Sequence, residues 1–348
     1  MSRYGIEVFR RDGTSIVLDH QTTVTKILGM GSKASSYGEW NTGITIPTGI
    51  TIPTGHEYCL WMSSFAWLEY VVGRNGGRSQ WTPGRHAYNR AYLDANRVLK
   101  VNSVNYNTAL PASYYGVYTW PVGTVRGNYG VQFFGANNIS GINDISQFTC
   151  LLFKGEIDIY NGWLPSHINA GFTPNKVICF FYTEDANKTI VTDTLGNVDN
   201  PPAVRSYRVF ASGSGETSPV RAKVCIFGNG ALKKDNYGLE IYSSQSHSLV
   251  YNSGYDMLAR PKLTLLSGMA LGEKKRVPGI SRPMYAPCNI GGLYSNHWQV
   301  KVWINSNGTQ IGPSWGDAVY QPASYGPDTY FVGDIPILLL DAADYFRF

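Results

Sequence analysis

The hexapeptide YGIEVF at residues 4–9 occurs in two further versions, YGVQFF at 129–134 and YGLEIY at 237–242. Each version begins with Tyr-Gly and continues with an aliphatic residue, Glu or Gln, an apolar residue and an aromatic ring. This alternation has the period of two that predicts a β-strand. The versions start 125 and 108 positions apart, which is the size of a small domain and not the period of a solenoid.

The equivalence of the three versions extends beyond the hexapeptide. An Asp or Asn stands fifteen positions after each tyrosine, and an apolar triplet precedes it in the first and third copies (16–18 and 249–251). A strand, a turn and a returning apolar strand predict a β-hairpin. We therefore interpret the three versions as internal repeats that serve as a structural element. Their defining residues are Tyr4, Gly5 and Asp19, then Tyr129, Gly130 and Asp144, then Tyr237, Gly238 and Asn252.

The rest of the chain also has the pattern of β-strands. Apolar runs of strand length, bounded by Gly, Pro, Asn or Ser, occur at 58–62, 148–153, 177–182, 223–227, 298–304 and 335–340. Helical patterning is scarce, and its best candidate is residues 85–99, whose apolar spacings of three and four predict one helix. We expect a mainly β fold of tandem sandwich-like units with little helix. The predicted units are 1–116, 117–220 and 221–348, each containing one hairpin motif.

Three segments are predicted to be loops, edges or linkers. Residues 44–49 and 50–55 duplicate the sequence ITIPTG, and a proline at the fourth position excludes a central strand. This insertion in the first unit is therefore an extended edge or a projecting loop. The Gly-rich residues 73–77 and the sequence up to residue 85 indicate an exposed loop, and the Gly/Ser-rich residues 212–218 indicate a linker.

Composition excludes several classes of protein. Charged residues make up 15 % of the chain, against about 25 % in an ordinary soluble protein, and aromatic residues make up 14 %. This combination favours β-sheets and surfaces buried against other subunits. The net charge of +5 is scattered, so nucleic acid is not an expected partner. Charges interrupt the first residues and no apolar run is long enough to span a bilayer, so neither export by a signal peptide nor membrane insertion is expected.

The five cysteines are never closer than 29 positions and form no CxxC pair. This spacing predicts reduced, buried thiols in a protein made in a cytosol, and it excludes a zinc ribbon. The six histidines are scattered and include no HExxH pair. The chain has neither a GxSxG elbow nor a phosphate-binding GxxxxGK[ST] loop. We therefore expect no catalytic residue, no cofactor and no metal site, and we expect that the protein is not an enzyme.

Two pairs of carboxylates keep a glycan hydrolase open as an alternative, because glycosidases use two carboxylates across a groove. Glu156 and Asp158 alternate along a predicted strand and share one face, and Asp341 and Asp344 stand near the end of the chain. We interpret the first pair as exposed strand residues and the second as part of a turn.

A recognition surface has stronger support than a reaction. Rings and guanidinium groups, which are enriched at binding hot spots, occur together in one stretch of the chain. A second aromatic group, at residues 114–120, fits either a surface patch or core packing. The residues of the predicted interaction surface are Arg74, Arg78, Trp81, Arg85, Tyr88 and Tyr92.

The repeated motif resembles one found in small structural proteins encoded in the tail-tip and baseplate regions of siphovirus-like bacteriophages. Those proteins open with Met, a few residues and Tyr-Gly-aliphatic-x-apolar-aromatic, followed by Asp about fifteen positions later. Residues 4–9 and Asp19 match this pattern, as do residues 237–242 with Asn252 in place of Asp. The resemblance covers about sixty of the 348 residues and carries over no catalytic residue.

The resemblance implies a structural virion protein of a phage tail tip or baseplate, such as a minor tail protein, synthesised in the host cytoplasm. Its expected partners are other tail or baseplate proteins, contacted through β-rich aromatic interfaces, in a homo-oligomer or another symmetric multi-copy assembly. One alternative is a tail adhesin for host attachment, which would bind a host cell-surface receptor or glycan. A tail-associated glycan hydrolase is another alternative, and a capsid decoration protein is the weakest.

Overall fold

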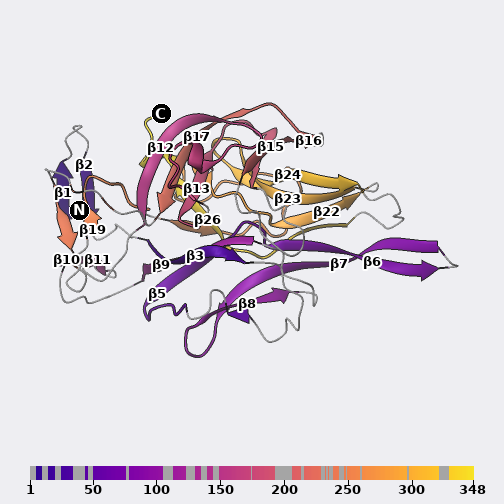
Figure 1. Ribbon diagram of the computed structural model, residues 1–348, viewed down its shortest axis with the longest axis horizontal. Helices are drawn as coiled ribbons and strands as arrows, with labels where there is room; N and C mark the ends of the chain where they lie inside the picture. Colours follow the sequence, from indigo (N-terminus) through magenta and orange to yellow (C-terminus); the bar gives the residue numbers. More distant parts are fainter. Residues whose placement is uncertain are drawn as a thin grey trace.

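The computed structural model confirms a mainly β protein (Figure 1). Among the residues it describes there is no α-helix, and the helical turns are 3-10 turns at Pro165–His167 and Ala342–Asp344. In the same residues, no helix is long and apolar enough to cross a lipid bilayer. The described residues are 5–9, 15–19, 25–33, 44–45, 50–75, 78–104, 113–122, 130–134, 139–143, 149–173, 175–192, 206–212, 215–228, 232, 234, 238–242, 247, 249–258, 261–295, 298–320 and 329–348.

The three sequence motifs form three hairpins, as predicted. Each hairpin is a separate antiparallel two-stranded sheet. The start of its first strand pairs with the end of its second strand, at or next to the Asp/Asn position of the motif. These pairs are Gly5 with Asp19, Gly130 with Asn143 and Glu240 with Asn252. The three motif tyrosines and Asp144 lie outside the described residues. Figure 1 draws all three hairpins at one end of the longest axis, and we call them together the hairpin cluster. Its strands are β1 (Gly5–Phe9) and β2 (Ser15–Asp19), β10 (Gly130–Phe134) and β11 (Ile139–Asn143), and β18 (Glu240–Tyr242) and β19 (Leu249–Asn252).

A ring of backbone hydrogen bonds joins the three chain segments that leave these hairpins. Thr25 N donates to Leu258 O at 3.1 Å, Leu258 N donates to Thr149 O at 2.9 Å, and Thr149 N donates to Thr25 O at 3.2 Å. These residues stand 21, 20 and 21 positions after the three motif tyrosines, and all three are fully buried. Equivalent positions of the three repeats therefore meet at one point.

The other strands form two sheets from the first third of the chain and three from the rest. The first two are β3-β9-β5 and β4-β8-β7-β6. Their strands are β3 (Lys26–Lys33), β4 (Ile44–Thr45), β5 (His56–Met62), β6 (Ala66–Asn75), β7 (Arg78–Leu93), β8 (Leu99–Val104) and β9 (Ser113–Pro121).

A six-stranded sheet, ordered β12-β17-β13-β21-β26-β20, forms the centre of the rest. Its strands are β12 (Cys150–Ile159), β13 (Val177–Tyr182), β17 (Val220–Gly228), β20 (Lys262–Thr264), β21 (Pro283–Tyr285) and β26 (Ile337–Asp341). The sheet β14-β15-β16 consists of Lys188–Thr192, Tyr207–Ala211 and Gly215–Glu216. The sheet β24-β23-β22-β25 consists of Ile311–Tyr320, Trp298–Ser306, Gly291–Ser295 and Thr329–Val332.

The central sheet is covered on both faces, which explains the continuous apolar run of β13. Phe180 joins the largest core together with residues of β5, β9 and β26. Phe181, on the other face, joins a second core with Trp163 and Tyr207. A strand buried on both faces lacks the apolar–polar alternation of a half-exposed strand, and all six residues of β13 are buried.

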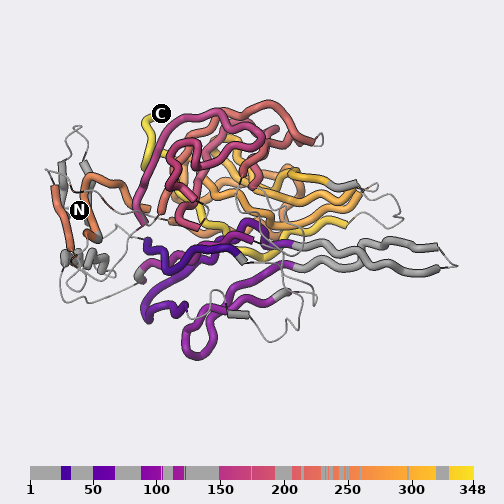
Figure 2. The backbone as a smooth tube through the Cα atoms, viewed as in Figure 1, coloured from indigo at the N-terminus to yellow at the C-terminus, as the bar shows by residue number. Residues whose placement is uncertain are grey.

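The predicted division into three separate units needs correction. The boundary at 116/117 falls inside β9, and the boundary at 220/221 falls inside β17. The central sheet also takes β12 and β13 from the second predicted unit and β20, β21 and β26 from the third. Figure 2 shows the early strands, in indigo and purple, against the yellow C-terminal segment, as their shared core requires. The repeats are therefore hairpins attached to one shared body.

Three local predictions are also wrong. The helix predicted at 85–99 is a strand, because β7 pairs with β6 on one side and β8 on the other. The loop predicted at 73–85 belongs to the same β6–β7 hairpin, and the linker predicted at 212–218 contains β16, which pairs with β15. In each case, pairing with a neighbouring strand prevails over local propensity.

The ITIPTG duplication is predicted to be an extended edge or a projecting loop, and its described residues, 44–45 and 50–55, support the extended edge, whereas residues 46–49 lie outside the described residues. β4 pairs Ile44 with Val101 at the edge of its sheet, and Thr51 in the second copy bridges to Val98. Ile52 is fully buried, whereas Pro53 is exposed. All five cysteines are buried and free, as predicted.

Candidate functional site

A groove of about 420 Å³ lies where β12, β13 and β17 approach the C-terminal segment. Its lining combines seven charged residues with two aromatic rings. The lining residues are Glu156, Tyr182, Thr183, Glu184, Asp185, Lys188, Pro219, Val220, Arg221, Ala222, Lys223, Arg347 and Phe348.

The register of β12 against β17 produces the charged wall of this groove. Glu156 pairs with Lys223 and Asp158 pairs with Arg221, so acids and bases stand opposite one another. Lys223 Nζ lies 3.2 Å from Glu156 Oε2, and Arg221 contacts both Glu156 (3.2 Å) and Asp158 (3.3 Å). Hydrogen bonds from Arg221 and Lys223 lower the pKa of Glu156. The predicted common face of Glu156 and Asp158 is confirmed.

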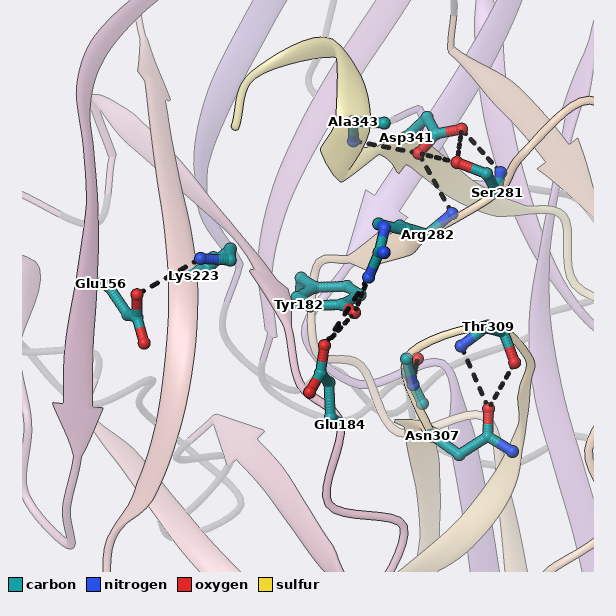
Figure 3. A network of polar contacts seen from close by, with 12 residues as sticks. Glu156, Tyr182, Glu184, Lys223, Ser281, Arg282, Asn307, Thr309, Asp341 and Ala343 are labelled. Atoms are coloured by element: carbon teal, nitrogen blue, oxygen red, sulfur yellow. Dashed lines mark hydrogen bonds and ion pairs between the residues drawn. The ribbon is translucent and has the colours of Figure 1, made fainter. Parts of the chain in front are cut away.

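A second network links two lining residues of the groove, Tyr182 and Glu184, to Arg282 in the segment before β21 (Figure 3). Tyr182 Oη donates to Glu184 Oε1 at 2.6 Å, and Arg282 Nη1 donates to Tyr182 Oη at 2.9 Å. Arg282 also forms an ion pair with Glu184 at 3.7 Å. Desolvation, reinforced by the hydrogen bond to Glu184, raises the pKa of Tyr182 to about 12. The phenol therefore acts as a neutral bridge between an acid and a base.

Phe348 provides an aromatic surface between these charges. The Arg282 guanidinium carbon lies 3.8 Å from its ring centroid and Lys223 Nζ lies 5.1 Å from it. The Tyr182 ring meets the Phe348 ring at 75° with centroids 5.2 Å apart. Phe348 remains 52 % exposed. An exposed ring bordered by hydrogen-bonding charges is suited to binding a polar ligand that has one apolar face.

Asp341 fixes the backbone segment that carries Arg282, and so supports this network. Its carboxylate accepts hydrogen bonds from the backbone N–H groups of Ser281 (2.6 Å), Arg282 (3.1 Å) and Ala343 (3.1 Å) (Figure 3). It thereby caps the terminal 3-10 turn and fixes the backbone of Arg282. The interpretation of this acid as part of a turn is confirmed.

The residues of the predicted interaction surface lie apart from the groove. All six stand on β6 or β7, but the side chains of Arg74, Arg78, Trp81 and Arg85 lie outside the described part of the structure. Tyr88 and Tyr92 are half-buried, and Tyr88 packs against the largest core. Tyr88 thus has a packing role in the body of the protein.

The aromatic group at residues 114–120 belongs to the core and not to the surface. Tyr114, Tyr115, Tyr118 and Trp120 are at most 8 % exposed. Trp61, on β5, is also buried, with 4 % of its surface exposed. Of the two interpretations of this aromatic group, core packing is the one that the structure supports.

Sequence reasoning missed the groove as a unit, although it identified Glu156 and Asp158. The signal that could have found it is the matching alternation of Arg221 and Lys223 in a second strand. Among the described residues, no group of three or more His, Cys, Asp or Glu side chains is placed to hold a metal ion.

Comparison with known proteins gives one match. No curated protein and no solved structure matches the chain. Residues 8–319 match a family described as a family of unknown function, DUF6453. This match covers the second and third hairpins completely and the first hairpin from Val8 onward. It also covers most of the strands of the shared body. The chain therefore belongs to the DUF6453 family.

Proposed function

We propose that this protein is a structural component of a bacteriophage tail tip or baseplate, located in the virion. The observation that carries the proposal is the hairpin cluster: the motif that resembles tail-tip proteins occurs three times and is joined by a backbone ring. A repeated element without chemistry of its own, placed at one end of the molecule, fits assembly with neighbouring tail proteins (Figure 1).

A tail adhesin is the second candidate, and the groove favours it. The exposed ring of Phe348 and the charged groups beside it resemble the mixture of stacking and hydrogen bonding that binds sugars and other polar ligands. The two roles are compatible, because the groove and the hairpin cluster consist of different residues.

The electrostatics of the groove give less support to a glycan hydrolase. A glycosidase acid needs a raised pKa so that it can donate a proton. Arg221 and Lys223 instead lower the pKa of Glu156, which keeps it ionised. Nothing in the described residues specifically favours a capsid decoration protein, so it stays the weakest alternative.

Immunogold electron microscopy of purified phage particles tests the structural proposal. The expected result is label at the tail tip, in particles from cells that encode this protein. Particles carrying the gene but bearing no label, with the protein confined to the cell lysate, would reject it. Label along the capsid would favour the decoration alternative instead.

A further inference from the structure

The central sheet has one edge that is open along most of its length. Strand β12 is the outermost strand on that side, and within the described part of the chain it pairs with β17 alone (Figure 1). Only its first residues are tied on the outer side, where Leu151 N donates to Asp256 O at 2.8 Å and Cys150 bridges to Met257. Beyond Leu151, no other described residue makes a backbone hydrogen bond to this edge. An open edge presents unpaired N–H and C=O groups to any segment that can form a further strand.

The opposite edge of the same sheet is protected, in contrast to β12. β20 contains only three residues, and the ammonium group of Lys275 donates to the carbonyl of Leu265 just beyond them. A very short edge strand is an ordinary protection against strand addition. β12 is ten residues long and keeps a regular register with β17 from Phe153 to Ile159. It therefore offers a ladder long enough to accept another strand.

The exposed side chains of β12 alternate in charge along one face of the strand. Lys154, Glu156 and Asp158 are all exposed and share this face. Lys154 Nζ lies 3.3 Å from Asp256 Oδ2, and Glu156 Oε2 lies 3.2 Å from Lys223 Nζ. The side chains of Lys154 and Glu156 are nevertheless 46 % and 48 % exposed, so both can contact a further charge.

The other face of β12 is apolar, with a glycine at its centre. Phe153 and Ile157 are half-buried and pack against the second core. Gly155 lies between them under the Phe153 ring, because a Cβ built there would be 2.6 Å from that ring. A glycine inside a strand also permits close approach of another backbone.

We infer that β12 pairs in the antiparallel sense with β12 of a second copy of this chain, about a twofold axis at Gly155. In this register Lys154 of each copy stands opposite Glu156 of the other, and Phe153 stands opposite Ile157. The contact is isologous, so each favourable pair occurs twice. The two central sheets then become one continuous sheet, and the apolar pairs extend the second core of each copy.

The charges select this register among those that a twofold axis allows. Residues directly opposite in antiparallel strands point to the same face, whereas neighbours along a strand point to opposite faces, so the axis passes through a residue. An axis at Lys154 or at Glu156 places that residue against its own copy, and an axis at Ile157 places Glu156 against Asp158. Each of these arrangements sets like charges opposite, which destabilises a sheet. The axis at Gly155 sets none.

A second copy is the occupant because the complementarity lies within one segment of this chain. The paired stretch of residues 153–157 is short and forms a small interface, so the dimer is weak and depends on concentration. The inference concerns the protein by itself and does not rest on the proposed function.

Sedimentation velocity of the purified full-length chain, from about 1 µM to about 300 µM, measures the dimer. We expect a monomer at the lowest concentration and a growing fraction of dimer above it. Hydrogen exchange at the two extremes locates the contact, and backbone amides of residues 152–158 should exchange more slowly in the dimer. A monomer at every concentration, or a dimer without protection of β12, would overturn the inference.

Charge reversal tests the register. Lys154→Glu and Glu156→Lys each set like charges opposite, so each variant alone should dimerise about tenfold more weakly or less. An equal mixture of the two should dimerise again, because the acids of the first variant then face the lysines of the second. Lys262→Glu makes the same change of charge on β20 and is the control, with no expected effect.

Recovery in the mixture separates pairing between copies from damage within one copy, because mixing does not restore an ion pair lost inside a chain. Circular dichroism verifies that each variant is folded. Folded variants whose mixture stays as monomeric as its components would rule out this register. A dimer in solution with no label on phage particles would keep the inference and reject the proposed function, and label at the tail tip without a dimer would do the opposite.

Discussion

At the scale of a single residue, the buried ammonium group of Lys274 lowers the free energy of unfolding by a measurable amount. Its Nζ is buried without a hydrogen-bond partner among the described residues, and desolvation lowers its pKa to about 8. The unfolded chain has a lysine pKa of about 10.4, so between these values it binds more protons than the folded chain does. The free energy of unfolding should therefore rise with pH from about 8 to 10.4, and the penalty is complete below pH 8.

Lys274→Met should raise the free energy of unfolding by about 1–3 kcal/mol at pH 7, because it removes this penalty. The rise between pH 8 and 10 should also become smaller. Urea unfolding at pH 7 and 9.5 measures both effects, with the exposed Lys262→Met as the control. Equal destabilisation of the Lys274 variant at both pH values would contradict this account.

Tyr182 links the groove to its support through one hydroxyl group. Tyr182→Phe should cost about 1 kcal/mol of stability, since the Glu184 acceptor and the Arg282 donor both lose a neutral partner. The raised pKa means that the neutral phenol stabilises the fold fully below about pH 10, and that this contribution is lost as pH rises toward 12. Denaturation of wild type and variant at pH 7 and 11 should show the difference shrinking at the higher pH.

At the scale of the element, the motif glycine is required by the geometry of the third hairpin. Gly238 has φ of +109°, and a Cβ built there would lie 2.2 Å from Ser253 Oγ. Gly238→Ala should therefore destabilise the hairpin by about 1–3 kcal/mol, through backbone strain and the clash together. Gly268→Ala is a matched control, because Gly268 has φ of +78° and open space around it. Faster hydrogen exchange in residues 238–258 of the first variant alone is the expected result.

The sequence predicts the hairpins better than it predicts the sheets, and the reason is distance along the chain. A hairpin depends on alternation and a turn within about fifteen residues, so all three were found. Glu156 meets Lys223 only through the pairing of β12 with β17, which no local pattern specifies. The unit boundaries were predicted wrongly for the same reason. Part of β7 was predicted to be helical because the local pattern does not reveal its strand partners, β6 and β8.

At the scale of the whole molecule, the shared core predicts one cooperative unfolding transition for the body. Cys59, Cys179 and Cys288 lie far apart in the sequence but are all buried, and desolvation raises the pKa of Cys59 to about 12. A thiol reagent should therefore leave the native protein unmodified, and all five thiols should react together at the rate of global unfolding. Early reaction of one cysteine would show that part of the body opens independently.

A fragment ending at residue 220 should fail to fold. It would retain β12 and β13 but lose β17, which pairs with both of them, and β21 and β26 beyond. Circular dichroism and proteolysis of this fragment, beside the full chain, measure the effect. A stable, protease-resistant fragment would restore the separate units that the sequence favoured.

The backbone ring also determines how mechanical force would travel through the protein. A pull on the hairpin cluster reaches the body through the segments that enter and leave the hairpins, and the three that leave, at Thr25, Thr149 and Leu258, are each tied to the other two. Tension that arrives on one of these three is therefore passed to its neighbours and does not load one linker alone. Separating the three leaving segments by force would require their shared hydrogen bonds to break, which makes this junction more resistant to pulling than three untied linkers.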